Sequence, residues 1–132
     1  MMRTLYEDAY FVITLDPTKR LLRATRSSLP FPTVEIADDV MTRLTTTLRM
    51  DDVKGYAILV DSRLAPGRND TSFESMMASK RSQLFTPFSK RAILLRTMAG
   101  VLQNQRLQRE AHDHIEMMTF LEEDKALAYL AS

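Results

Sequence analysis

The chain contains no cysteine and no tryptophan, and only three of its 132 residues are glycine. The absence of cysteine excludes disulfides, thiol catalysis and thiolate metal sites. The net charge of +1 gives no global field that would attract nucleic acid or an anionic membrane surface. No apolar run approaches the length of a membrane span, and acids interrupt the N-terminal segment where a signal peptide needs its apolar stretch. We therefore expect a cytoplasmic protein with no nucleic-acid binding and no membrane insertion.

The rest of the composition is typical of an ordinary folded domain. Apolar residues make up 45% of the chain and charged residues 27%. A chain of this length can bury roughly two-thirds of its unfolded surface as one unit. No repeat, low-complexity tract or linker divides the sequence. We predict a single domain that spans residues 1–132.

Predicted strands and helices alternate along the chain. Apolar runs bounded by turn residues indicate strands, and apolar residues at helical spacing indicate helices. The predicted strands are 9–15, 20–27, 56–60, 91–96 and 115–118, and the predicted helices are 34–48, 72–85, 99–110 and 121–130. This order, β-β-α-β-α-β-α-β-α, predicts an α/β fold with a mixed, mostly parallel sheet, because a strand that returns through a helix must pair in parallel.

Residues 54–74 are the most informative stretch of the sequence. Residues 56–60 form a continuous apolar run, which is typical of a strand buried on both faces of a parallel sheet. A polar loop follows, and Thr71 with Glu74 predicts a capping box at the start of the next helix. Thr119 with Glu122 predicts a second capping box at the last helix. Open α/β folds bind their ligands at such a strand–loop–helix edge.

No catalytic or metal constellation emerges from the sequence. Asp61-Ser62 suggests a nucleophile, but no histidine lies in a comparable strand-end loop and the Gly-x-Ser-x-Gly elbow is absent. His112 and His114 flank Asp113, but no further ligand lies at helical or loop spacing, so a solvated corner is the favoured interpretation. Walker and dinucleotide-binding glycine patterns are also missing. We therefore predict a protein that is not an enzyme and has no cofactor or metal.

Three arginines are expected at one edge of the sheet. Arg63 and Arg68 lie in the loop after the central strand, and Arg96 follows the next parallel strand. With Asn69, they predict a site for an anion or a partner around the positive N-terminus of the helix 72–85. The alternative is that the arginines are solvated and pair with the aspartates of the same segment.

Three phrases carry a resemblance to a known family over nearly the whole chain. They are YAILVD with its loop into the next helix, RAILLRT, and the closing MMTFLEEDKALAYL. With the order of elements, they resemble the STAS domain and, more closely, the bacterial SpoIIAA-like family, which is STAS-like and related to the lipid-binding CRAL-TRIO fold. The resemblance implies a non-enzymatic regulatory or protein-interaction module.

The resemblance also implies candidate site residues. In STAS antagonists, an Asp-Ser-Ser-Gly-like helix start carries a hydroxyl that a partner kinase phosphorylates. By position, Thr71 and Ser72 match this hydroxyl pair and are the phospho-acceptor candidates, with a regulatory kinase or an anti-sigma-like factor as the partner. Phe73 stands where the family has glycine, and its bulk is expected to crowd a docking kinase. The alternative is that Thr71 and Ser72 only cap the helix.

The CRAL-TRIO relationship implies a second class of function, a carrier of a small ligand or lipid. A carrier needs a deep apolar cavity, and we expect the core of this chain to consume its apolar residues. The interaction module is therefore the first expectation and the carrier the alternative. Assembly into a homodimer is left open.

Overall fold

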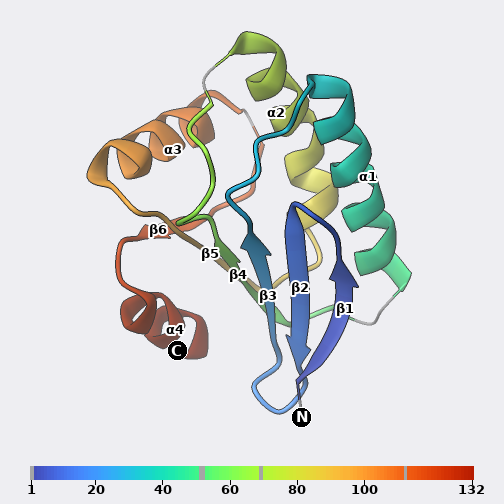
Figure 1. Cartoon of the computed structure of the whole chain (residues 1–132). Coiled ribbons are helices and arrows are strands. Elements are labelled where there is room, and N and C mark those ends of the chain that lie inside the picture. Colours follow the sequence, from blue (N-terminus) through green and yellow to red (C-terminus); the bar gives the residue numbers. More distant parts are fainter. Residues whose placement is uncertain (1, 51–52, 69, 112) are drawn as a thin grey trace.

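In the computed structural model, the strands and helices follow one another in the predicted order, with one additional strand at the N-terminus. The structure describes residues 2–50, 53–68, 70–111 and 113–132 (Figure 1). Within these residues the strands are β1 (Arg3–Glu7), β2 (Phe11–Asp16), β3 (Leu21–Arg26), β4 (Ala57–Asp61), β5 (Lys90–Leu94) and β6 (Met118–Phe120). The helices of the same residues are α1 (Val34–Met50), α2 (Thr71–Phe85), α3 (Met98–Glu110) and α4 (Glu123–Ala131). The α/β class is confirmed.

The described strands form one mixed sheet in the order β1-β2-β3-β4-β5-β6. The pairs β1–β2 and β2–β3 are antiparallel, and the three later pairs are parallel. The predicted order lacked β1 and is wrong in that respect. The segment 3–7 is short and has a charged residue at each end, so its local sequence does not indicate a strand. Pairing with β2 imposes the extended conformation.

The last strand begins three residues later than predicted. The backbone of residues 115–117, expected in the strand, is bound by side chains instead. Arg81 Nη2 donates to the Ile115 carbonyl at 3.0 Å, and the Met117 N–H donates to Gln108 Oε1 at 3.2 Å. These bonds hold the segment toward α2 and α3, so pairing with β5 starts only at Met118.

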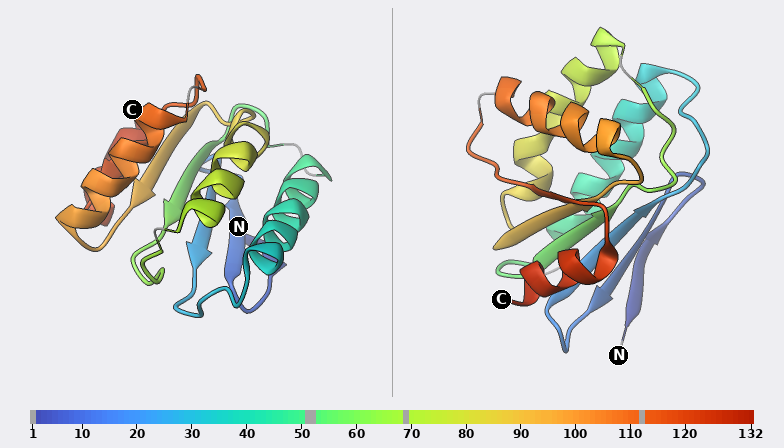
Figure 2. Two further views of the ribbon diagram at one scale, coloured as in Figure 1. Left: turned by 90° about the horizontal axis from the view of Figure 1, so that it is seen from above. Right: turned by 90° about the vertical axis from the view of Figure 1, so that its left-hand side faces the viewer.

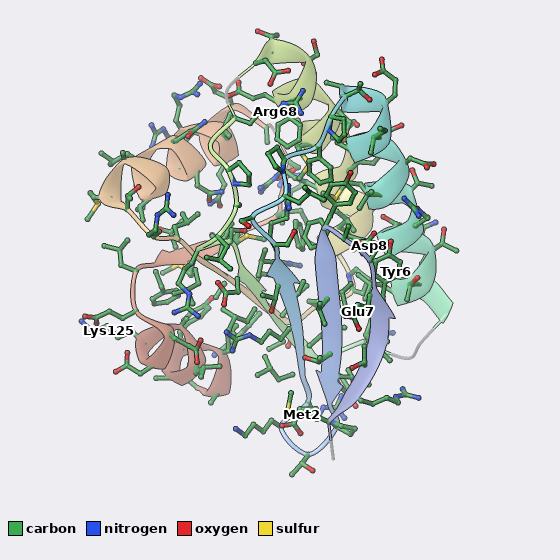
Figure 3. All side chains as sticks on the ribbon, in the orientation of Figure 1. Met2, Tyr6, Glu7, Asp8, Arg68 and Lys125 are labelled. Carbon is green, nitrogen blue, oxygen red and sulfur yellow. The ribbon has the colours of Figure 1, made fainter. Side chains whose placement is uncertain are left out.

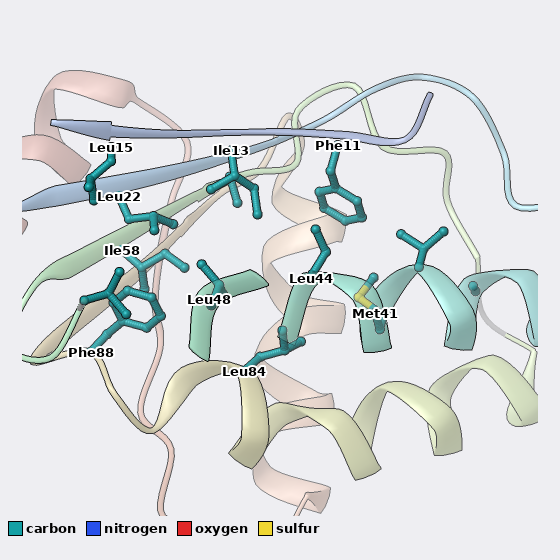
Figure 4. Close-up of a cluster of buried hydrophobic side chains, with 14 of the residues drawn as sticks. Phe11, Ile13, Leu15, Leu22, Met41, Leu44, Leu48, Ile58, Leu84 and Phe88 are labelled. Carbon is teal, nitrogen blue, oxygen red and sulfur yellow. The ribbon is translucent and has the colours of Figure 1, made fainter. Parts of the chain in front are cut away.

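Helices cover both faces of the sheet. Strands β3 to β6 are added in one direction, so right-handed crossovers place α1, α2 and α3 on the same face. Figure 2 shows these three helices on one side and α4 alone on the other. The main core fills the space between α1, α2 and the strands (Figure 4); its largest members include Phe11, Ile13, Leu15, Leu22, Leu44, Leu48, Ile58, Leu84 and Phe88.

A smaller core lies under α4. Ala126 and Leu130 of α4 pack on the second face of β4 and β5, at Leu59 and Leu94. Ile58 is buried on the opposite face, so β4 is covered on both sides, as its apolar run predicts. No helix in the described part of the chain is long and apolar enough to cross a membrane.

Candidate functional site

A cavity of about 740 Å³ lies between the sheet and helices α1, α2 and α3. Helix α2 packs against α1, and α3 contacts β6. Apolar side chains from the sheet and the helices line the space, among them Ile58, Val60, Ile93, Leu44, Phe73, Met77 and Leu107. The core was expected to consume the apolar residues, and lining residues such as Ile58 and Leu44 are indeed buried in it. A count of apolar residues does not reveal the cavity, because its volume depends on where the helices lie.

Aromatic rings and two arginines form one wall of this cavity. The Phe31 ring stacks on Tyr10 with 4.7 Å between ring centres, and it lies 6.2 Å from the ring of Phe73. Arg26 Cζ lies 4.3 Å from the centre of the Phe31 ring, and Arg68 Cζ lies 4.8 Å from that of Phe73. Arg68 Nη1 also donates to the Phe31 carbonyl at 3.2 Å. Phe31 and Phe73 line the cavity, and we call these two residues the aromatic wall.

Arg26 is the most deeply buried cation of the lining, with 6% of the residue exposed. Its Nη1 donates to the carbonyl and hydroxyl oxygens of Ser27, at 2.8 and 3.3 Å. Burial lowers the pKa of the guanidinium, and the negative charge of Asp8 opposes this only in part. A signal for this position exists in the sequence: Leu22, Ala24 and Arg26 alternate along β3, so they share the face that meets the core.

The N-terminus of α2 is capped by Asp70. Asp70 has an extended backbone, and its carboxylate accepts from the Phe73 N–H at 3.4 Å. The predicted capping box of Thr71 and Glu74 is therefore wrong: Thr71 is the first helical residue, and the Glu74 N–H donates to the Asp70 carbonyl. Thr71 and Ser72 are both exposed on the first turn. Figure 3 labels Arg68, whose Nε lies 2.6 Å from Asp70 Oδ1.

The second predicted capping box is also wrong. Thr119 lies within β6, where its hydroxyl accepts from Gln105 Nε2 at 3.1 Å. Glu122 takes the N-cap position of α4 without a side-chain hydrogen bond to the helix. The strand extends to Phe120, which leaves Glu122 rather than Thr119 at the turn into the helix.

The predicted arginine site is divided between two places. Arg68 lies at the N-terminus of α2, but it pairs with Asp70. Arg63 turns toward Asp61, in contact with the N-terminus of α4. Arg96 is exposed, and Asn69 lies outside the described residues. Two of the three arginines thus pair with carboxylates of the chain itself, and a role in binding an anion or a partner stays a prediction.

Arg63 belongs to a four-residue ion cluster with Arg23, Asp61 and Glu123. Both arginines contact Asp61 Oδ2 at 2.8 Å, and they contact Glu123 Oε1 at 2.6 and 2.9 Å. Burial acts to raise the pKa of Asp61, but hydrogen bonds from Arg63 and Arg23 outweigh it and lower the pKa to about 2. The cluster joins β3, β4 and α4, and sequence reasoning missed Arg23 and Glu123 because no local pattern links them.

The described residues offer no group of three or more metal-ligating side chains. Asp113, the centre of the histidine-flanked sequence, forms an ion pair with Arg81, whose Nε lies 3.0 Å from Asp113 Oδ2. His112 lies outside the described residues. In the described part of this segment, the aspartate therefore serves to hold the chain between α3 and β6.

Comparisons with known proteins leave the family open. No protein-family model matches the chain, and searches of the curated proteins and of the solved structures find no match either.

Proposed function

We propose that the chain is a non-enzymatic binding domain whose cavity takes a small apolar or amphipathic ligand. The observation that carries this proposal is the cavity of about 740 Å³ between the sheet, α1, α2 and α3. Ligand sites in proteins typically have volumes of roughly 300–1,000 Å³, apolar walls and a few polar groups. This cavity has the same character, with the aromatic wall at one side and Arg26 and Arg68 in its lining.

The resemblance to the SpoIIAA-like family supports the same proposal. That family is STAS-like and related to the CRAL-TRIO fold, whose members carry lipids. The order of elements after β1 agrees with the predicted order that underlies the resemblance. The cavity weighs against the argument that ranked the carrier second, which was that the core leaves no apolar space. Ligand binding therefore becomes the first proposal.

Two variants on the same helix test ligand binding. Met77 lines the cavity from α2, whereas Gln83 on the same helix is exposed and outside the lining. We expect Nile red, a neutral apolar dye, to bind the wild-type protein saturably. Met77→Trp fills part of the cavity and is expected to weaken binding at least about ten-fold, while Gln83→Trp adds the same indole and leaves binding unchanged.

Native mass spectrometry of the protein purified from the expressing cells gives an independent readout. A co-purifying small molecule that is lost in Met77→Trp supports the proposal. If the wild-type protein carries no ligand and binds no Nile red, the cavity is empty packing space and the proposal is wrong.

A second candidate function is a STAS-like regulatory module that meets a protein partner through residues 61–72. Its supporting observation is the first turn of α2, where Thr71 and Ser72 are exposed. The Phe73 ring packs against Phe31 and Arg68, which directs its bulk away from the two hydroxyls. A phosphoryl group at a helix N-terminus is favoured by the helix dipole and by a neighbouring arginine such as Arg68.

A pull-down with the wild-type protein as bait tests the regulatory candidate. Thr71→Asp imitates the phosphorylated form, and a double substitution of Thr71 and Ser72 to alanine prevents phosphorylation. We expect a kinase or anti-sigma-like factor to bind the wild-type chain and to be lost with Thr71→Asp. Ser82→Ala, an exposed hydroxyl on the same helix, serves as the control. Equal recovery from all four baits would contradict a phospho-switch at this turn.

A further inference from the structure

Most of the charged side chains that line the cavity have an ion-pair partner or are in contact with solvent. A charge that leaves water must be compensated, because an unpaired buried ion is strongly unfavourable. Ion pairs join Arg63 to Asp61, Arg68 to Asp70, Arg81 to Asp113, and both Glu74 and Glu110 to Arg106. Arg96 is exposed and hydrated by solvent.

Arg26 is the exception in this lining. Only 6% of the residue is exposed, yet no described carboxylate forms an ion pair with it. Asp8 attracts it from a distance, but Asp8 accepts hydrogen bonds from the Tyr6 hydroxyl and from the N–H groups of Tyr10 and Phe11. Among the described residues, only Ser27 accepts hydrogen bonds from the guanidinium, and both come from Nη1.

The surroundings of Arg26 stabilise the cation without neutralising it. The rings of Tyr10, Phe11 and Phe31 have centres 5.6, 5.6 and 4.3 Å from Arg26 Cζ. An aromatic face attracts a cation more weakly than a carboxylate attracts it. It also accepts no hydrogen bond from the N–H groups that lie in the plane of the guanidinium. The charge is therefore held in an aromatic pocket with its Nε and Nη2 donors available.

We propose that Arg26 anchors the anionic end of the ligand, and that the ligand is an amphipathic monocarboxylate. This inference rests on the proposed ligand-binding function. A guanidinium presents parallel N–H donors that match the two oxygens of a carboxylate. The apolar body of the ligand then lies along the cavity, against side chains such as Leu44, Leu48 and Leu84.

A second carboxylate in the cavity limits the ligand to one anionic group. Glu74 on α2 lines the cavity, and its Oε2 is buried without a hydrogen-bond partner. Its ion pair with Arg106 Nη2 is 3.6 Å long, and the same arginine also pairs with Glu110. One cation thus serves two carboxylates, and the remaining negative charge repels a second anion and favours a neutral or hydrogen-donating group at the far end of the ligand.

Competition with bound Nile red tests the anchor with ligands that differ only in their end group. We expect dodecanoate to displace the dye from the wild-type protein at about ten-fold lower concentration than dodecanol, since charge-assisted hydrogen bonds are roughly twice as strong as neutral ones. Dodecanedioate should bind less tightly than dodecanoate. Arg26→Met should abolish the preference for dodecanoate over dodecanol, while Arg49→Met, which removes an exposed arginine outside the lining, should retain it.

A second readout needs no variant. The side-chain Nε–H resonance of Arg26 should shift when dodecanoate is added and should stay in place with dodecanol. An unmoved resonance, or an Arg26→Met protein that still prefers dodecanoate, overturns the anchor while the ligand-binding function stands. If Nile red binds but none of the three probes displaces it, the anchor is overturned and the ligand-binding function stands. If the dye does not bind and no ligand co-purifies, the proposed function falls and the anchor falls with it.

Discussion

Arg23 Nη2 lies 2.6 Å from Glu123 Oε1, although 100 residues separate the two in the chain. Arg23 is on β3 and Glu123 begins α4, so this ion pair ties the centre of the sheet to the last helix. Asp61, at the end of β4, completes the connection through the same arginine. The four-residue ion cluster thus holds α4 against the face of the sheet that α1, α2 and α3 leave uncovered.

Loss of the Asp61 charge should destabilise the fold. The pKa of Asp61 is lowered to about 2 from an ordinary value of 3.8. A lowered pKa means that the stabilisation is present above the unfolded-state pKa and is lost as the pH falls through about 2. We expect Asp61→Asn to reduce the free energy of unfolding by about 2 kcal/mol at neutral pH, measured by urea denaturation.

Near pH 2 the difference between Asp61→Asn and the wild-type protein should shrink, because the wild-type carboxyl is then partly protonated. Asp124→Asn is the matched control, since Asp124 is exposed on α4 and outside the ion cluster. A difference that is independent of pH would mean that Asp61 stabilises the protein by packing and not by charge.

The residue that caps α2 differs from the residues proposed to be phosphorylated, so the two roles can be tested separately. Asp70 caps the helix, so Asp70→Ala should lower the free energy of unfolding by about 1 kcal/mol. Thr71 is exposed and does not cap, so Thr71→Ala should stay within about 0.5 kcal/mol of the wild-type protein. Thermal unfolding of both variants checks the difference. Equal destabilisation would indicate that Thr71 shares the cap.

The helices and most strands were predictable because they depend on local patterns. Apolar spacing predicted α1 to within two residues, and the apolar run of β4 predicted its burial on both faces. The caps were not predictable to the same degree, because Asp70 and Thr71 are both good N-caps and the loop geometry decides between them. The strand β1 was missed because its conformation comes from pairing with β2.

The candidate site was predictable only in part. Alternation along β3 indicates that Arg26 faces the core, and that information was in the sequence. The cavity was not, because its volume depends on the placement of α2 and α3 relative to the sheet. The partners of Arg63 were also beyond local reasoning, since Glu123 is 60 residues away.

Gly55 should resist substitution. Its backbone has φ +83°, and an added Cβ would lie 3.2 Å from Arg20 Nη2. A left-handed backbone costs a residue with a Cβ about 1–2 kcal/mol, so Gly55→Ala should lose about that much stability. Gly67→Ala is the control, because nothing lies within 4 Å of its added Cβ. We expect it to be unchanged or about 0.5 kcal/mol more stable in chemical denaturation.

The hydroxyl of Tyr6 should ionise only at an unusually high pH. Burial, together with a hydrogen bond to Asp8, raises its pKa to about 12. A raised pKa means that the folded state keeps this proton where the unfolded chain releases it. The resulting stabilisation is therefore complete below pH 10.0 and is lost as the pH rises through about 12. Titration of the tyrosine ring resonances by NMR measures this pKa directly (Figure 3 labels both residues).

Asp8→Asn should lower the pKa of Tyr6 toward 10.0, since it removes the negative charge beside the hydroxyl. Tyr6→Phe should remove the tyrosine titration near pH 12 and should lower the free energy of unfolding by about 1 kcal/mol, because the hydrogen bond is lost. If a titration near pH 12 persists in Tyr6→Phe, it belongs to another tyrosine.

The order of strands in the sheet has a consequence for how the chain folds. Every described strand pairs with the strand that precedes it in sequence, from β1 to β6. No strand must be inserted between two that are already joined, so the sheet can grow outward from its N-terminal hairpin during synthesis. Each addition closes only one crossover loop, which keeps the entropic cost of every step small. We expect α4, whose Glu123 needs Arg23, Asp61 and Arg63 in place, to dock last and to come off first when the protein unfolds.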